Sequence, residues 1–442
     1  MTRNNKGRGR SAVPAWAALG LCLAAIVSGA AVADETGSVA DSGSGARIIV
    51  KFRPRVQAPR AGEAKPQAAE ADAALALAAR HGVELRQSRR LASNLQLLQI
   101  DPQSAGESVG AALARLRADS AVEYAELDVR RHPRALPDDP LFSQQWYLQS
   151  TSVAPSAIDA EDAWDLSEGS AGIVIADVDT GVLFDHPDLK RTSEGGRILP
   201  GYDFVTDPAA ANDGDGRDPD AADPGDWVTD AETRTQKFGG CDAEDSSWHG
   251  TRVAGILGAD TDNADGIAGE TWKAWILPVR ALGKCGGYDS DILPAMLWAA
   301  GIHVDGVPDN PFPAKIVNLS IGAPGACPAA YQDVIDQLSA RGVLVVVAAG
   351  NEGGPVDAPA DCSGVAAVTG LRQAGTKVGF SNLGPEITLG APGGNCVNTA
   401  PGTACLYPID TTSDTGTTTP AAFSYTDQTD FSVGTSFSAP IV

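Results

Sequence analysis

Short runs of consecutive apolar residues, separated by segments with a helical pattern, restrict the fold of this chain more than any other feature. Four such runs follow Pro137: Gly172–Ala176, Ala274–Val279, Lys315–Leu319 and Val343–Val347, with helical segments at residues 249–258, 290–301 and 328–341. A strand that is apolar on both faces must be covered on both faces, which is typical of a parallel sheet between two layers of helices. We therefore predict an α/β domain of this kind over residues 135–442.

The preceding part of the chain has a different pattern. Residues 34–46 are rich in Gly, Ser and Ala and read as a linker, and residues 47–134 follow the order strand, helix, strand, helix, strand. This order predicts a small α+β domain. It ends in Arg130-Arg131-His132-Pro133-Arg134, a charged, proline-interrupted segment typical of a linker or a cleavage site.

The first 33 residues have the pattern of a signal peptide. Four basic residues precede the apolar run Ala12–Val32, and Ala31-Val32-Ala33 is a small-residue cleavage pattern, so we expect cleavage before Asp34. The alternative is a membrane anchor, but Pro14, Gly20 and the pair Ser28-Gly29 interrupt the run. We therefore expect a secreted, extracellular protein with no membrane association after cleavage.

Charge is distributed unevenly along the chain. Residues 46–134 carry 15 Lys and Arg against 10 Asp and Glu, whereas residues 135–442 carry 14 against 43. An acidic domain is a poor partner for nucleic acid. The imbalance suits calcium binding, solubility outside the cell and attraction for the chain's own basic leader.

The cysteines fit an oxidising compartment. Once Cys22 leaves with the signal peptide, an even number of six remains: Cys241, Cys285, Cys327, Cys362, Cys396 and Cys405. Six cysteines allow 15 pairings, of which we favour neighbours pairing in chain order. A zinc cluster is the competing interpretation, although no two of these cysteines have the C-x2-C spacing common in such sites.

Candidate catalytic residues are few because the chain has only five histidines. His249 precedes a run of glycine and small residues at a predicted helix start, where a histidine alone is more often structural. Asp179 follows a predicted strand, and Asp179-Thr180-Gly181 together with Asp414-Thr415-Gly416 would suit an aspartic protease. Asp414, however, lies in a Thr-rich loop without an apolar strand, and the order of strands and helices does not fit an all-β protease.

Asp179, His249 and Ser436 follow each other in the chain order of the subtilisin triad. Seven segments in the same order resemble the subtilisin-like serine proteases: Val178-Asp179-Thr180-Gly181-Val182 with His186-Pro187-Asp188-Leu189, His249-Gly250-Thr251, Asn318-Leu319-Ser320-Ile321-Gly322, Ala348-Ala349-Gly350-Asn351-Glu352-Gly353, Phe380-Ser381-Asn382, Ala391-Pro392-Gly393 and Gly434-Thr435-Ser436-Phe437-Ser438-Ala439-Pro440. The resemblance extends over residues 137–442. It departs from the family at Phe437, where methionine is common.

The resemblance implies a serine endopeptidase that acts on proteins or peptides. Ser436 would be the nucleophile, His249 the general base, Asp179 the residue that orients the imidazole, and Asn351 an oxyanion donor. Two segments of small residues would form the pocket walls, Ser320-Ile321-Gly322 and Ala348-Ala349-Gly350. Lys284-Cys285-Gly286 would be an edge strand that pairs with extended substrate. Because the edge strand would recognise the substrate backbone and the pocket walls would be open, the resemblance implies broad specificity.

Structural calcium is a further implication of the resemblance, and no organic cofactor is expected. The implied ligands are the side chains of Asp139, Asp188, Asn263 and Asp265 and the carbonyl groups of Asp260 and Ile267. A solvated acidic loop is the alternative. The acidic segment Asp203–Asp230 is a candidate for a second ion, but its EF-hand-like start fails because the twelfth position is Pro224 rather than glutamate.

Residues 47–134 would then be an inhibitory propeptide that the enzyme itself removes, with the cut between Arg131 and Asp138. We expect a monomeric zymogen whose peptidase domain continues beyond Val442. Two alternatives remain open at this point: a catalytically silent relative that binds proteins, and a fragment that is inactive as written.

Overall fold

The computed structural model describes residues 46–53, 66–101, 108–128, 136–396, 405–426 and 432–442. The chain divides into two compact units, Met1–Arg131 and His132–Val442. Each is described by itself below.

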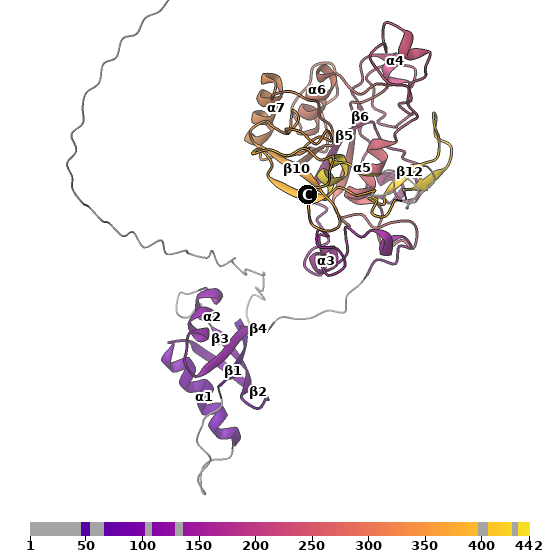
Figure 1. The fold of residues 1–442 in the computed structure, drawn as a ribbon. Coiled ribbons are helices and arrows are strands. Elements are labelled where there is room, and N and C mark those ends of the chain that lie inside the picture. Colours follow the sequence, from indigo (N-terminus) through magenta and orange to yellow (C-terminus); the bar gives the residue numbers. More distant parts are fainter. Residues whose placement is uncertain (1–45, 54–65, 102–107, 129–135, 397–404, 427–431) are drawn as a thin grey trace, which may run out of the picture. The chain divides into compact units, whose positions relative to one another are not determined.

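An antiparallel sheet with two helices forms the N-terminal unit (Figure 1). Its elements are β1 (Ala46–Phe52), α1 (Pro66–Arg80), β2 (Glu84–Ala92), β3 (Leu95–Asp101), α2 (Val109–Arg117) and β4 (Val122–Leu127), and the strand order is β2-β3-β1-β4. This is the β-α-β-β-α-β arrangement of ferredoxin-like domains. The predicted α+β class is therefore correct, with one strand more than predicted.

The extra strand, β2, was missed because it has almost no apolar face. Alternate residues of β1, Ile48, Val50 and Phe52, are buried in the core of this unit, as period-two alternation requires. Within β2, by contrast, every residue is exposed except the partly buried Leu85 and Ser88. A polar edge strand gives the sequence pattern little to detect.

A seven-stranded parallel sheet is the centre of the C-terminal unit (Figure 1). Its order is β11-β10-β9-β8-β5-β7-β6, with β5 (Val174–Asp179), β6 (Tyr202–Asp203), β7 (Trp275–Arg280), β8 (Ile316–Leu319), β9 (Leu344–Ala348), β10 (Val365–Leu371) and β11 (Leu389–Pro392). The helices are α3 (Ala160–Trp164), α4 (Pro208–Ala211), α5 (His249–Gly258), α6 (Asp289–Ala299), α7 (Ala329–Ala340) and α8 (Thr435–Ser438). All four predicted strands and all three predicted helices are present within a few residues of their predicted bounds.

Helices cover both faces of this sheet, which confirms the predicted fold class. In β9, Val345 and Val347 pack with α6 and α7, whereas Val346 and Ala348 pack on the opposite face with α5 and α8. Alternating contacts of this kind explain why the strand sequences are continuously apolar. The strands β6 and β11 were not predicted, because β6 has only two residues and β11 contains Gly and Pro; the seven-residue strand β10 was also missed.

A hairpin of β12 (Thr412–Asp414) and β13 (Phe423–Tyr425) packs against α5. The Asp414 carboxylate accepts hydrogen bonds from the backbone N–H groups of Gly416 and Ala421, so it closes the turn of this hairpin. Asp414 therefore has a local structural role, unlike the second aspartate of an aspartic protease.

Three disulfides follow the favoured pairing. Cys241–Cys285, Cys327–Cys362 and Cys396–Cys405 have Cα–Cα distances of 5.7, 5.0 and 4.6 Å, within the usual range for disulfides. Among the described residues, no helix has the length and apolar character needed to cross a membrane.

Candidate active site

Asp179 is the last residue of β5, at the carboxyl edge of the sheet, and its carboxylate is buried. One of its oxygens accepts the backbone N–H of Thr180 at 2.7 Å, and both oxygens lie 2.8 Å from Nδ1 of His249. The central strand thus fixes the carboxylate that holds the imidazole.

His249 is the first residue of α5, and its side chain is 23% exposed. Burial lowers the pKa of His249, but the adjacent Asp179 carboxylate favours the charged ring, and the pKa lies above its ordinary value as a result. Since Nδ1 of His249 is bonded to Asp179, Nε2 is the ring nitrogen that remains to accept or donate a proton. An imidazole held in this way is suited to general base chemistry.

Ser436 lies in the first turn of α8, beside the carboxyl end of β8. Its hydroxyl donates to the carbonyl of Ser320 at 3.0 Å, and the Ser320 hydroxyl donates to the carbonyl of Ser436 at 2.7 Å. The ring of Phe437 packs 5.7 Å from that of His249. No hydrogen bond joins His249 to Ser436 within the described residues; such bonds are often formed only once substrate is bound.

The side chain of Asn351 is held by the residue before Ser436. Its Oδ1 accepts the backbone N–H of Thr435 at 2.9 Å and the Thr435 hydroxyl at 3.1 Å. The Thr435 hydroxyl also accepts the N–H of Gly350 at 3.1 Å. With Oδ1 engaged, the NH₂ group of Asn351 is the part of the amide left to donate to a ligand.

A cleft of roughly 530 Å³ contains Ser436, Thr435 and Asn351. Seven of the predicted substrate residues line it: Ser320, Ile321, Gly322, Ala348, Gly350, Cys285 and Gly286. Ala349 does not, because it faces the other side of the sheet and packs in the core with α6 and α7. The small walls therefore come from the ends of β8 and β9, two neighbouring strands.

Lys284 and Cys285 differ from the predicted edge strand. Gly283 and Gly286 pair with each other through two backbone hydrogen bonds of 3.0 Å, so Lys284 and Cys285 form the turn between them. Cys285 has a positive φ of 67° and is tied to Cys241. The Lys284 side chain is buried and outside the cleft, with its ammonium group 2.7 Å from Glu232 and over the ring of Trp227.

The residues predicted to bind calcium converge from three segments. Asp139 and Asp188 are buried, and the loop after α5 closes over them: Asp262 donates its N–H to Asp139 at 2.9 Å, and Asn263 and Ile267 donate to Asp188 at 2.9 and 3.0 Å. Burial raises the pKa of Asp188 to about 6. In the part of the chain that the structure describes, neither Asp139 nor Asp188 forms an ion pair with Lys or Arg. Two buried carboxylates without a cation fit a calcium ion.

The other predicted ligands lie in or beside the same loop. Asp265 donates its N–H to the side-chain oxygen of Asn263 at 2.7 Å. Asp260 donates its N–H to the carbonyl of Asp188 at 2.8 Å, while its carboxylate lies 3.8 Å from Arg197. Within the acidic segment Asp203–Asp230, Arg280 pairs with Asp203 and with Asp213, the latter at 2.7 Å. A basic side chain therefore already neutralises part of that segment.

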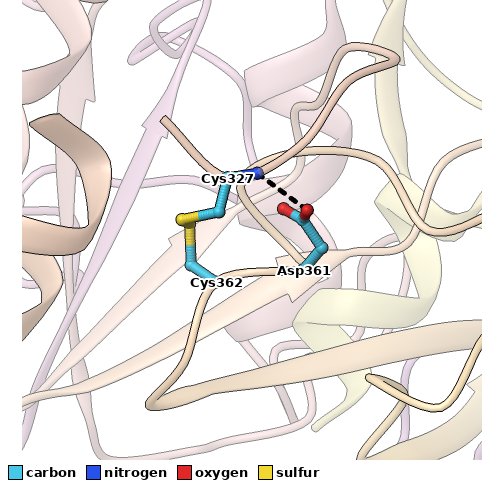
Figure 2. A group of neighbouring side chains, drawn as sticks. All are labelled: Cys327, Asp361 and Cys362. Atoms are coloured by element: carbon cyan, nitrogen blue, oxygen red, sulfur yellow. Dashed lines mark hydrogen bonds between the residues drawn. A yellow bond between two sulfur atoms is a disulfide. The ribbon is translucent and has the colours of Figure 1, made fainter. Parts of the chain in front are cut away.

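Figure 2 shows a separate group of side chains of metal-binding types, Cys327, Asp361 and Cys362, whose ligand atoms lie within 4.8 Å of one another. The two cysteines form a disulfide, and Asp361 accepts the backbone N–H of Cys327 at 2.8 Å. Since metal ligation requires free thiolates, this group is a covalent brace rather than a zinc site.

Comparison with known proteins identifies the family of this chain. A sequence profile of the subtilase family matches residues 170–442, more than half of the chain. The chain belongs to the subtilase family. Among solved structures, this subtilase is similar to a protease from Pseudoalteromonas arctica, with a TM-score of 0.62 and 39% identity over 70% of this chain and 84% of that one.

Curated relatives of the subtilase include bacterial proteases. It is 39% identical to an extracellular protease of Xanthomonas campestris over 81% of this chain and 57% of that protein. It is 42% identical to an extracellular basic protease of Dichelobacter nodosus over 63% of this chain and 45% of that protein. The chain spans about half the length of these curated relatives.

A second layer of residues, not predicted from the sequence, supports Asp179 and His249 in this subtilase. The Thr180 hydroxyl donates to the buried Asp223 at 2.8 Å and accepts the N–H of Gly250 at 3.0 Å. Asp226 accepts both the N–H and the hydroxyl of Ser247, at 2.6 and 2.7 Å. Their position is the only indication of this role in the sequence: Thr180 follows Asp179, and Ser247 lies two residues before His249.

A buried carboxyl group, Asp177, lies two residues before Asp179 and was also missed. Asn318 donates its NH₂ group to Asp177 at 3.1 Å and to the Ser320 hydroxyl at 3.0 Å. Because the Ser320 hydroxyl in turn holds the backbone of Ser436, Asp177 belongs to a polar network beneath the nucleophile candidate.

Proposed function

We propose that this subtilase is a secreted serine endopeptidase. In this proposal Ser436 attacks the peptide carbonyl, His249 takes its proton and passes it to the leaving amine, and Asp179 holds the imidazole in the required tautomer. Asn351 and the backbone N–H of Ser436 donate to the oxyanion. The observation that carries the proposal is the buried Asp179 carboxylate on Nδ1 of His249, in the same edge of the sheet as a cleft that contains Ser436 and Asn351.

Broad specificity is part of the proposal. The walls around Ser436 are small residues from the ends of β8 and β9, and they leave space for many side chains. Extracellular location is proposed from the names of the relatives and from three disulfides, which persist in oxidising compartments. Polypeptides are the proposed substrates, and nucleic acid is not a proposed partner because the peptidase unit is strongly acidic.

We further propose that residues 47–134 are an inhibitory propeptide released by the enzyme itself. The support is a separate compact unit with its own core, joined to the peptidase unit through the basic segment that ends at Arg134. The proposed cut, between Arg131 and Asp138, falls largely outside the described residues.

Calcium is proposed as a structural ion. Asp139, Asp188, Asn263 and Asp265 would hold it with side-chain oxygens and Asp260 and Ile267 with carbonyl groups, and the ion would neutralise two buried carboxylates. The ion has no proposed part in peptide hydrolysis.

Expression of the natural gene with and without Ser436→Ala tests the activity. A fluorophosphonate probe should label wild type at Ser436 and leave the variant unlabelled, and the leader should be released only by wild type, as followed by mass spectrometry. Thr435→Ser, which keeps the neighbouring hydroxyl, is the matched control and should be labelled. Release of the leader by Ser436→Ala in a purified preparation would contradict self-processing, and an unlabelled wild type would favour a catalytically silent binding protein.

A further inference from the structure

The floor of the cleft carries two carboxyl groups that the proposed mechanism does not use. Asp357 is buried between the two walls: its side chain lies against Gly350 on one wall and within 3.4 Å of the position a β-carbon would take at Gly322 on the other. Glu352 lies beside it and also lines the cleft. These are the two predicted walls of small residues, so Asp357 closes the bottom of the slot that they form.

Neighbouring donors hold Glu352 in place. One of its oxygens accepts the backbone N–H of Asn351 and the NH₂ group of Asn382, each at 2.9 Å. The carboxyl groups of Glu352 and Asp357 lie close enough to act directly on each other. A carboxyl pair this close is stable only while the two groups share a proton or a cation compensates their charge.

No cation in the cleft provides that compensation. The charged residues among those that line the described cleft are Asp289, Glu352 and Asp357, with no Lys, Arg or His. Another carboxylate, Asp361, also acts on Asp357 and raises its pKa. The charged side chains that line the cleft beside the pair are therefore all negative.

The position of the two carboxyl groups in the cleft determines which part of a substrate they would contact. In the proposed mechanism, the carbonyl that Ser436 attacks lies between Ser436 and Asn351, so the side chain of the residue before the cut enters the slot between the two walls. A slot with small apolar walls and an acidic floor is complementary to an apolar stem with a cationic end. Lys and Arg are the side chains of this kind.

We propose that Asp357 and Glu352 form a cation receptor at the floor of the cleft and give this subtilase a preference for Lys or Arg immediately before the cut. The inference rests on the proposed function, since it needs Ser436 to be the nucleophile. It refines the proposed broad specificity. The pocket accepts many different side chains before the cut, and substrates with Lys or Arg at that position are cut fastest.

Protonation makes the preference dependent on pH. Burial and the neighbouring Glu352 raise the pKa of Asp357 to about 6, whereas the pKa of Glu352 lies below its ordinary value because its interactions with Asn382 and Asp357 outweigh its burial. Below pH 6 the pair therefore carries one negative charge and above it two. The preference for a cationic side chain should rise with pH through this range.

Quenched peptides that differ only in the residue before the cut, Lys or norleucine, test the proposal on the full chain. We expect wild type to cleave the Lys peptide about 10- to 100-fold faster in kcat/KM at pH 8, the range expected for hydrogen bonds to a charged group. The ratio should be smaller at pH 5. Because His249 titrates equally for both peptides, its ionisation cancels in the ratio.

Variants locate the source of the preference. Asp357→Asn and Glu352→Gln should each lower the Lys-to-norleucine ratio about tenfold or more. Asp289→Asn, which removes a cleft carboxylate bonded to Tyr331, should leave the ratio unchanged, because that group is not part of the floor. Equal ratios in wild type and Asp357→Asn, or an equal loss in Asp289→Asn, would overturn the proposal.

Binding separates this inference from the proposed function. Ser436→Ala should bind a peptide ending in Lys more tightly than one ending in norleucine, and Asp357→Asn in that background should lose the difference. Lys-dependent binding without catalysis by wild type would refute the endopeptidase and support the receptor. Catalysis by wild type without a preference for Lys in binding or cleavage would support the endopeptidase and refute the receptor.

Discussion

Thr435 shows how much of the candidate site depends on one hydroxyl group. It accepts from Gly350, donates to Asn351, and its own N–H holds the same oxygen of Asn351. The Asn351 amide is thus fixed before any substrate arrives. Donors aimed in advance at a developing charge are a large contribution to catalysis.

Replacement of Thr435 by Val should lower kcat about tenfold at nearly unchanged KM. Valine keeps the shape and the backbone N–H but loses the hydroxyl, and a hydrogen bond contributes about 0.5–1.5 kcal/mol. Steady-state kinetics normalised by fluorophosphonate titration measure the effect. Thr435→Ser should retain most of the turnover; equal losses in the two variants would contradict a role for the hydroxyl.

At the scale of elements, β5 carries two buried aspartates of different character. Asp179 is bound to His249, whereas one oxygen of Asp177 has no hydrogen-bond partner in the described structure, and neither has the side-chain oxygen of its neighbour Asn318. Burial and the nearby Asp179 raise the pKa of Asp177 well above its ordinary value. Asp177 therefore stays protonated and neutral over a pH range in which an exposed aspartate is charged.

Asp177→Asn should make the protein more stable at neutral and alkaline pH. The folded protein keeps a proton on Asp177 that the unfolded chain releases above the ordinary aspartate pKa of 3.8, so stability falls as pH rises from there through the folded pKa. Asparagine does not titrate, and its NH₂ group can donate to Asn318. In the Ser436→Ala background, scans should give a Tm higher by about 2–4 °C at pH 8, the shift for about 1 kcal/mol in a domain of this size. A Tm difference independent of pH would contradict the titration of Asp177.

Elements and triad candidates could be predicted from the sequence because each has a local pattern. Asp179 and His249 open or close regular elements, and their order with Ser436 is specific. Asp223 and Asp357 could not be predicted, because contacts with residues distant in the sequence give them their surroundings. Lys284 was wrongly assigned to an edge strand, because the Gly283–Gly286 pairing and the Cys241–Cys285 bond turn the chain there.

At the scale of the whole molecule, the proposed calcium site joins three segments of the peptidase unit. Asp139 precedes the sheet, Asp188 follows β5, and Asn263 and Asp265 follow α5. Without a cation, each of these buried carboxylates must either take up a proton or bear the cost of a buried, uncompensated charge.

Chelation of calcium should therefore lower the Tm of the Ser436→Ala protein by several degrees, and calcium but not magnesium should restore it. Asp188→Asn should lower the Tm and abolish the response to calcium. Asp333→Asn, which removes an exposed carboxylate from α7, is the matched control for net charge and should respond as the parent does. A parent Tm that is the same with chelator and with calcium would contradict the site.

The order of the chain has a consequence for the cell that makes this protein. Translation adds about 5–20 residues per second, so Asp179, His249 and Asn351 leave the ribosome on the order of seconds to tens of seconds before Ser436. Throughout that interval the nascent chain has the proposed partners of Ser436 but not Ser436 itself. A nascent chain that ends before Ser436 therefore cannot cut the ribosome or its neighbours.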